Sequence, residues 1–197
     1  MDEIADGLFH WTALHEGIHS HVHSHFHAPS GTLFDPMEPA EGLAWFDRTD
    51  RRPQRIVMSN RHHWRHIPRY VDAFGLPVLC HEAGLHDLPD SVHGFAFGDE
   101  LAPGVTAHEV GVLTPEETAL HIGGQGLLFA DAVVGGGDGE LGFVSDRLLG
   151  DDPPAIRAGL RARFRALAES LEFDALLMAH GAPIAPGGRS ALRAFAA

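Results

Sequence analysis

The stretch RIVMSNRHHWRHIPRYVDAFGLPVLCHEAG, residues 55–84, carries the strongest fold signal in the chain. It begins with an apolar run, passes through a cluster of histidines, and continues into a helical pattern and a second apolar run. Two apolar strands joined through an amphipathic helix are typical of an α/β fold. A cluster of histidines at the end of a strand is typical of a metal site. The rest of the sequence must show whether these histidines bind a metal.

The same patterns extend over the rest of the chain. They predict strands at 7–14, 18–28, 32–37, 55–60, 77–83, 91–97, 105–112, 117–122, 127–134 and 175–184. Helices are predicted at 38–47, 62–75, 151–173 and 187–197. Helices fall between groups of strands in both halves, which favours an αββα sandwich with helices outside two central sheets.

Composition limits the classes of protein to consider. The chain has 197 residues, 44% of them hydrophobic, and we expect a single domain over residues 1–197. Its formal charge of −13 disfavours nucleic acid and membrane surfaces as partners. The first residues do not resemble a signal peptide and no apolar run is long enough to span a bilayer, so a soluble, cytoplasmic protein is expected. With Cys80 the only cysteine, any metal must be held by His, Asp or Glu.

Four short motifs follow one another along the chain: SNRHHWR at 59–65, VGVLTPEETALHI at 110–122, FADAVV at 129–134 and AHGAP at 179–183. In this order, and over essentially the whole chain, the sequence resembles the metallo-β-lactamase fold superfamily. That resemblance implies an α/β protein with the αββα sandwich and a metal centre at the ends of the strands. Members carry Thr-His-x-His-x-Asp-His in the first motif and further ligands in the other three.

Most of the ligands that the resemblance implies are replaced here. Asn60, Trp64 and Arg65 stand where the first motif has metal ligands, and only His62 remains. Val112 or Leu113 stands at the histidine of the second motif. Asp131 and His180 are retained in the third and fourth motifs. Because an indole offers no lone pair to a metal and a guanidinium repels one, the resemblance argues against a dinuclear zinc hydrolase.

Three interpretations of the remaining groups stay open. In the first, His62, Asp131 and His180 bind a single divalent metal ion, which would be Zn, Fe or Mn. In the second there is no cofactor, and Arg65 or Arg61 pairs with Asp131 in a pocket that Asn60, Trp64, Arg65 and His66 help to line. In the third, the motif is shifted and His63 or His66 faces the pocket in place of His62.

These interpretations lead to two function hypotheses. The favoured one is a non-catalytic protein that binds a small molecule in the remnant pocket. The alternative is a mononuclear, hydrolase-like enzyme that uses His62, Asp131 and His180. The loop at 135–140, GGGDGE, and the pair Glu116 and Glu117 could border the same pocket.

A second histidine feature lies at IHSHVHSHFH, residues 18–27. On one strand, alternate residues share a face, so five imidazoles would lie in a row. They could be solvated, bind a second metal ion, or contact another copy of the chain in a homodimer. The residues are His19, His21, His23, His25 and His27.

Overall fold

Two β-sheets face each other in the computed structural model, which describes residues 1–48, 50–136 and 139–197. The first sheet has the order β1-β2-β3-β4-β5-β6-β7. Its strands are β1 (Asp2–Ala5), β2 (Leu8–His15), β3 (Ser20–His27), β4 (Thr32–Phe34), β5 (Arg55–Val57), β6 (Val78–His81) and β7 (Val92–Phe95). Neighbours are antiparallel from β1 to β4 and parallel from β4 to β7.

The second sheet has the order β14-β11-β10-β9-β8. Its strands are β8 (Glu100–Ala102), β9 (Val105–Glu109), β10 (Thr118–Ile122), β11 (Gly126–Phe129) and β14 (Ala175–Met178). Only the pair β11 and β14 is parallel. A small separate ribbon joins β12 (Val134–Gly135) to β13 (Leu141–Gly142).

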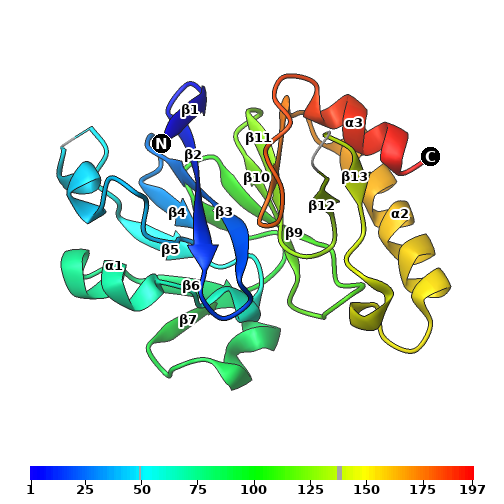
Figure 1. The fold of residues 1–197 in the computed structure, drawn as a ribbon, viewed down its shortest axis with the longest axis horizontal. Coiled ribbons are helices and arrows are strands. Elements are labelled where there is room, and N and C mark those ends of the chain that lie inside the picture. Colours follow the sequence, from blue (N-terminus) through cyan, green and yellow to red (C-terminus); the bar gives the residue numbers. More distant parts are fainter. Residues whose placement is uncertain (49, 137–138) are drawn as a thin grey trace.

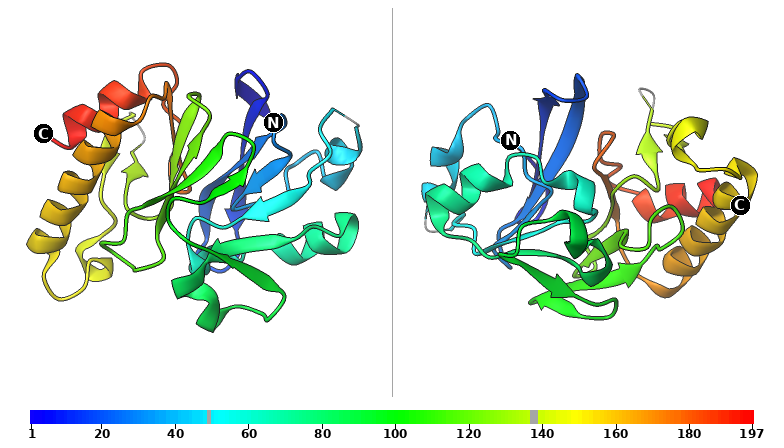
Figure 2. Two further views of the ribbon diagram at one scale, coloured as in Figure 1. Left: turned by 180° about the vertical axis from the view of Figure 1, so that it is seen from behind. Right: turned by 90° about the horizontal axis from the view of Figure 1, so that it is seen from below.

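Three α-helices cover the outer faces of the sheets (Figures 1 and 2). They are α1 (Ile67–Phe74), α2 (Pro153–Ser170) and α3 (Gly188–Phe195). Helix α1 packs Ile67 and Tyr70 on the first sheet, while Leu160 and Phe164 of α2 pack on the second. None of the helices in the described ranges is long and apolar enough to cross a membrane.

A third apolar cluster fills the space between the sheets. It joins Leu8, Phe34 and Val57 of the first sheet to Leu128 and Leu177 of the second. The four layers therefore run helix, sheet, sheet, helix, and the predicted αββα sandwich is confirmed.

Several element boundaries differ from the predictions. The helix expected at 62–75 is divided into a 3-10 turn, η2 (Arg61–His63), and α1, because Arg65 between them has a positive φ of 40°. The helix expected at 38–47 is a 3-10 turn, η1 (Leu43–Asp47), and strand β1 was not predicted. The remaining 3-10 turns are η3 (Glu82–Asp87) and η4 (Asp146–Leu148). Part of the predicted loop at 135–140 lies outside the described residues.

Candidate metal centre

The candidate metal centre lies where the parallel strands of both sheets end. In the second sheet Phe129 pairs with Met178, so the chain leaves β11 and β14 side by side. Asp131 and His180 each follow two residues after these strand ends. In the first sheet β4 and β5 are also parallel, with Asp35 directly after β4 and η2 shortly after β5. Carboxyl ends of parallel strands are a common place for ligand sites.

Three side chains converge there: His63, Asp131 and His180. The Nε2 atom of His180 lies 3.1 Å from Oδ1 of Asp131, and Nε2 of His63 lies 3.7 Å from the same oxygen. One ligand atom from each side chain lies within 4.8 Å of the other two. Two imidazoles and one carboxylate are a competent ligand set for Zn, Fe or Mn.

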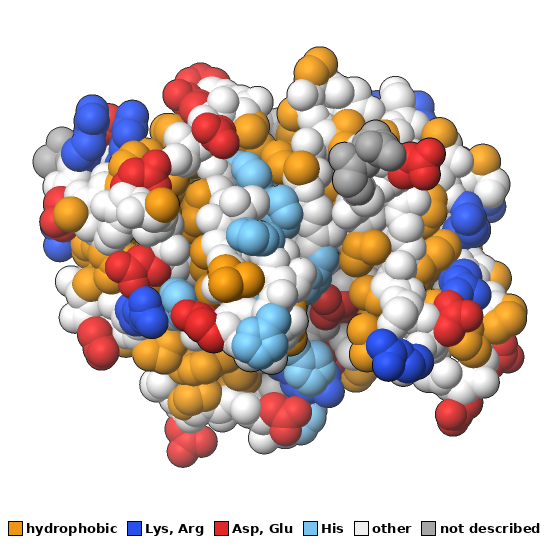
Figure 3. Space-filling view, in the orientation of Figure 1, with side chains coloured by type: hydrophobic (Ala, Val, Ile, Leu, Met, Phe, Trp, Pro, Cys, Tyr) orange, Lys and Arg blue, Asp and Glu red, His pale blue; other side chains and the backbone are white. Residues whose placement is uncertain are grey.

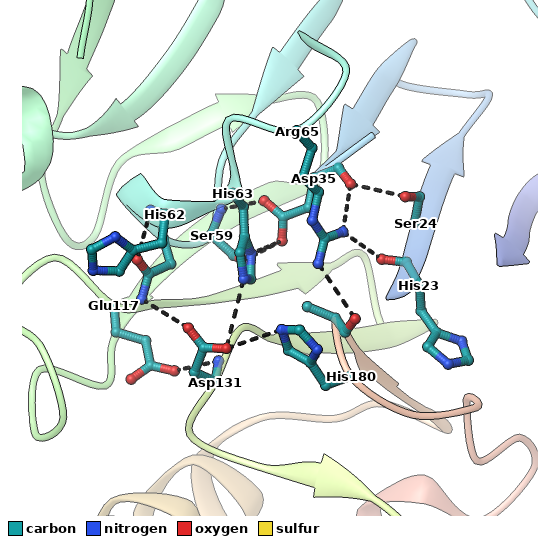
Figure 4. Close-up of polar contacts among 12 residues, drawn as sticks. His23, Ser24, Asp35, Ser59, His62, His63, Arg65, Glu117, Asp131 and His180 are labelled. Atoms are coloured by element: carbon teal, nitrogen blue, oxygen red, sulfur yellow. Dashed lines mark hydrogen bonds and ion pairs between the residues drawn. The ribbon is translucent and has the colours of Figure 1, made fainter. Parts of the chain in front are cut away.

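Asp35 orients His63 from behind (Figure 4). Nδ1 of His63 lies 3.0 Å from Oδ2 of Asp35, and Asp35 also accepts hydrogen bonds from the backbone N–H and the hydroxyl of Ser59. Both Asp35 and His63 are buried. This arrangement directs Nε2 of His63 toward Asp131, and a carboxylate behind a histidine is the usual support of a metal ligand.

The charges of these groups are strongly coupled. Burial alone would lower the pKa of His63, but the carboxylates of Asp35 and Asp131 together outweigh burial and raise the pKa to about 9. Burial alone would raise the pKa of Asp131, but the His63 charge and the hydrogen bonds from His180 and His63 hold it well below its usual range. Without a metal, the centre is therefore held together by ion pairs that His63 makes with two carboxylates.

Glu117 and Asn60 fix the carboxylate from the other side. Oε1 of Glu117 accepts hydrogen bonds from the backbone N–H groups of Asp131, at 2.9 Å, and Ala132, at 2.5 Å. Nδ2 of Asn60 lies 3.4 Å from Oδ2 of Asp131. Burial, followed by the charge of Asp131, raises the pKa of Glu117 to about 8. Glu117 thus holds the loop after β11 and does not enter the pocket.

The predicted contact between Arg65 and Asp131 is wrong. The Arg65 guanidinium donates to the backbone carbonyls of His23 and Asp35 at 2.8 Å and of Ala179 at 3.4 Å. Among the ion pairs of the described residues, none joins Arg65 to Asp131, whose partners are the two histidines. These carbonyls lie within β3, directly after β4 and directly after β14, so the guanidinium contacts both sheets.

Three other residues predicted near the site are placed elsewhere or at its edge. His62 lies outside the converging group, because the 3-10 turn brings the next residue, His63, to Asp131, while the His62 ring lines the pocket (Figure 4). Trp64 packs among the outer apolar residues of the first sheet. His66 accepts a hydrogen bond from the backbone of Glu38 and lies 3.4 Å from Glu16. His63 therefore joins Asp131 and His180, while both His62 and His63 line the pocket.

A pocket of about 230 Å³ opens beside the converging side chains. Its polar wall contains His63, Arg65, Asp131 and His180. Its apolar wall contains Ile18, Val22 and Leu148, and both Ile18 and Leu148 are exposed. An adjoining pocket shares Asp131 and Leu148 and continues to Leu113 and Thr114.

The histidine row differs from the predicted five-residue face. His19 has a φ of 51° and lies in the turn before β3, so only four histidines are on the strand. His21 is exposed, His23 is half-buried, and His25 and His27 are buried. Because Leu8 and Phe34 pair with His27 and His25 and belong to the cluster between the sheets, the imidazoles of this strand face inward.

Two residues that the sequence interpretation missed are Asp35 and His10. Asp35 follows directly after an apolar strand, just as Asp131 follows soon after another, and this position was a usable signal. His10 lies on β2 opposite His25, a pairing that depends on the register of the hairpin.

Comparisons with known proteins agree with this architecture. No family model matches the sequence, and no curated protein shows significant similarity to it. The DIM-1 metallo-β-lactamase structure superposes with a TM-score of 0.73 at 12% identity, covering 99% of this chain and 95% of that one. The metallo-β-lactamase from Erythrobacter litoralis gives a TM-score of 0.66 at 15% identity, covering 99% and 94%.

A third structure was solved with metal bound. TTHA1623, in a di-iron-bound form, has a TM-score of 0.60 and 22% identity, covering 92% of this chain and 91% of that one. At such identities the likeness concerns the fold. With its two sheets, its outer helices and its site at the strand ends, this chain has the metallo-β-lactamase fold.

Proposed function

We propose that the protein is a hydrolase-like enzyme that uses one divalent metal ion, held by His63, Asp131 and His180. The observation that carries this proposal is the convergence of these three side chains at the floor of an open pocket. The buried Asp35 carboxylate behind His63 supports it, because a histidine that binds a metal through one ring nitrogen usually has its other nitrogen held by a carboxylate or a carbonyl.

Three protein ligands are compatible with a catalytic metal site. A divalent metal with three protein ligands supplies Lewis acidity and lowers the pKa of a bound water. The protein contributes the rest: Asp35 fixes the His63 ring, and Glu117 and Asn60 fix Asp131. Arg65, half-buried at the pocket wall, adds a fixed positive charge that favours an anionic group in it.

The pocket walls indicate the kind of substrate. Ile18 and Leu148 come from different loops, and their exposed apolar side chains flank the same opening. Large exposed apolar side chains that meet at a pocket are a common feature of ligand sites. We therefore propose a small molecule with an apolar substituent and an anionic or carbonyl group.

His62 and His63 are neighbours in the sequence, so variants at these two positions test the proposal. Protein purified without an affinity tag should bind one equivalent of Co²⁺ or Zn²⁺ at this centre. His63→Ala should weaken that binding at least tenfold, and so should His180→Ala. His62→Ala is the matched control and should leave the affinity unchanged. Equal losses for His62→Ala and His63→Ala, or no metal bound by the wild type, would contradict the proposal.

A second candidate is a metal-free protein that binds an anionic small molecule. The observation that favours it is the set of ion pairs, since His63 already pairs with both Asp35 and Asp131. The metal titration separates the two candidates. Failure of the wild type to bind metal at neutral pH, with tight binding of an apolar carboxylate, would favour the second.

A further inference from the structure

A second group of histidines lies on the inward face of the β2–β3 hairpin. His10 comes from β2, and His23 and His25 come from β3. His10 pairs directly with His25 and lies diagonal to His23, so its ring stands between the other two. Figure 3 shows histidine side chains gathered along this part of the molecule.

The His10 ring lies at ligand spacing from each of the other two rings. The ring centres of His10 and His23 lie 5.1 Å apart, and those of His10 and His25 lie 5.3 Å apart. Two imidazoles on one tetrahedral ion, with metal–nitrogen bonds of about 2.0–2.1 Å, have ring centres roughly 5 Å apart. Nε2 of His10 and Nδ1 of His23 already approach to 2.8 Å.

His25 supplies an independent observation. It is fully buried, and within the described ranges neither of its ring nitrogens has a hydrogen-bond partner. Buried polar side-chain atoms in native proteins nearly always have a partner, so a side chain with two such atoms indicates a group that binds there. Its neighbour His27, by contrast, has its Nδ1 atom 2.8 Å from the hydroxyl of Ser30.

We propose that His10, His23 and His25 form a second metal site, separate from the centre at His63, Asp131 and His180. The ion would replace the contact between His10 and His23, and the His25 ring would have to turn about its Cβ–Cγ bond to direct a nitrogen to it. A set of imidazoles selects Zn²⁺, Co²⁺, Ni²⁺ or Cu²⁺ over Mg²⁺ and Ca²⁺, which prefer oxygen ligands.

The protonation state of the group suits this role. Burial lowers the pKa of all three histidines, and that of His23 falls to about 4. They are therefore neutral at pH 7, the form that binds a metal, and no proton has to be released first. The nearby charges are mixed: Asp2 acts on His10, and Arg65 acts on His23 and His25. His23 is half-buried and gives an ion access from the surface.

The test uses a variant in which the first centre is removed, His63→Ala with His180→Ala. Titrated with Co²⁺ and followed by calorimetry and visible absorption, this variant should still bind one equivalent, and Mg²⁺ should not compete. His23→Gln added to it should weaken Co²⁺ binding at least tenfold. His21→Ala, an exposed histidine two residues earlier on the same strand, is the control and should change nothing.

His10→Gln keeps the test decisive even if a variant at the fully buried His25 does not fold. It should weaken Co²⁺ binding as His23→Gln does. Circular dichroism verifies the fold of each protein. Absence of Co²⁺ binding in the folded double variant would overturn the inference, as would an equal loss from His21→Ala. If the wild type binds one equivalent that depends on His23 and not on His63, this inference stands and the proposed function fails.

Discussion

At the scale of single residues, Asp35 gives the candidate metal centre its orientation. It is buried, it accepts hydrogen bonds from Ser59, and it holds one nitrogen of His63 so that the other faces Asp131. A metal ligand with a free ring could turn away from the ion, whereas this one is fixed before binding. The affinity of the centre therefore depends on a residue that does not touch the metal.

Replacement of Asp35 by Asn tests this dependence. Asn keeps the shape but removes the charge that polarises His63, so the affinity for Zn²⁺ should fall by roughly 10–100-fold. Isothermal titration of the wild type and the variant measures the change. Asp87→Asn, at an exposed carboxylate that pairs with Arg61, is the control. Equal affinities in wild type and Asp35→Asn would show that Asp35 serves only the fold.

Some of these residues could be predicted from the sequence and others could not. Asp131 and His180 were identified because each follows a buried strand in a recognisable motif. The sequence could not decide between His62 and His63, because the alternation of side chains along a strand ends where the 3-10 turn begins. Asn60 caps that turn through a hydrogen bond to the backbone of His62, and this local geometry decides which ring reaches Asp131.

At the scale of elements, the β2–β3 hairpin combines a structural role with an unusual response to pH. Its apolar side chains Phe9, Trp11 and Phe26 pack against the aromatic rings of η1, while its histidines face the second sheet. The alternation of histidines with other residues on β3 could be predicted from the sequence. The inward direction of the histidines could not, because it depends on which face of the hairpin the second sheet covers. The turn at His19 shortened the predicted row by one residue.

Acid should destabilise this hairpin in the metal-free protein. Burial, with a contribution from His10, lowers the pKa of His23 from 6.5 to about 4. Between these values the unfolded state binds more protons, so the free energy of unfolding is intact above pH 6.5 and decreases as the pH falls toward 4. The lowered pKa of His25 acts in the same direction. Thermal melts in a chelating buffer should show this loss.

Substitutions on the hairpin identify the source of the effect. His23→Thr should flatten the dependence of the melting temperature on pH between 6.5 and 4. His21→Thr, on the same strand but exposed, should leave the wild-type profile unchanged. If His23→Thr keeps the full acid sensitivity of the wild type, His23 is not its source.

At the scale of the whole molecule, the two sheets meet at Arg65. Its guanidinium binds the carbonyls of His23 and Asp35 from the first sheet and of Ala179 from the second. The resemblance marked this position as a former ligand site, and a pairing with Asp131 followed from charge alone. That prediction failed because backbone carbonyls, one within β3 and two directly after β4 and β14, satisfy the guanidinium instead.

Arg65 should therefore stabilise the packing of one sheet against the other. Arg65→Ala removes three hydrogen bonds from a charged donor, which should lower the free energy of unfolding by about 3 kcal/mol. For a chain of this size that corresponds to a decrease of roughly 6–12 °C in melting temperature. Arg65→Lys should recover only part of the loss, because an ammonium cannot reproduce the planar fork of donors.

Arg69→Ala, at an exposed arginine that pairs with Glu38, is the matched control and should shift the melting temperature little. Equal melting temperatures for Arg65→Ala and Arg69→Ala would mean that the apolar cluster between the sheets holds them together without this contact.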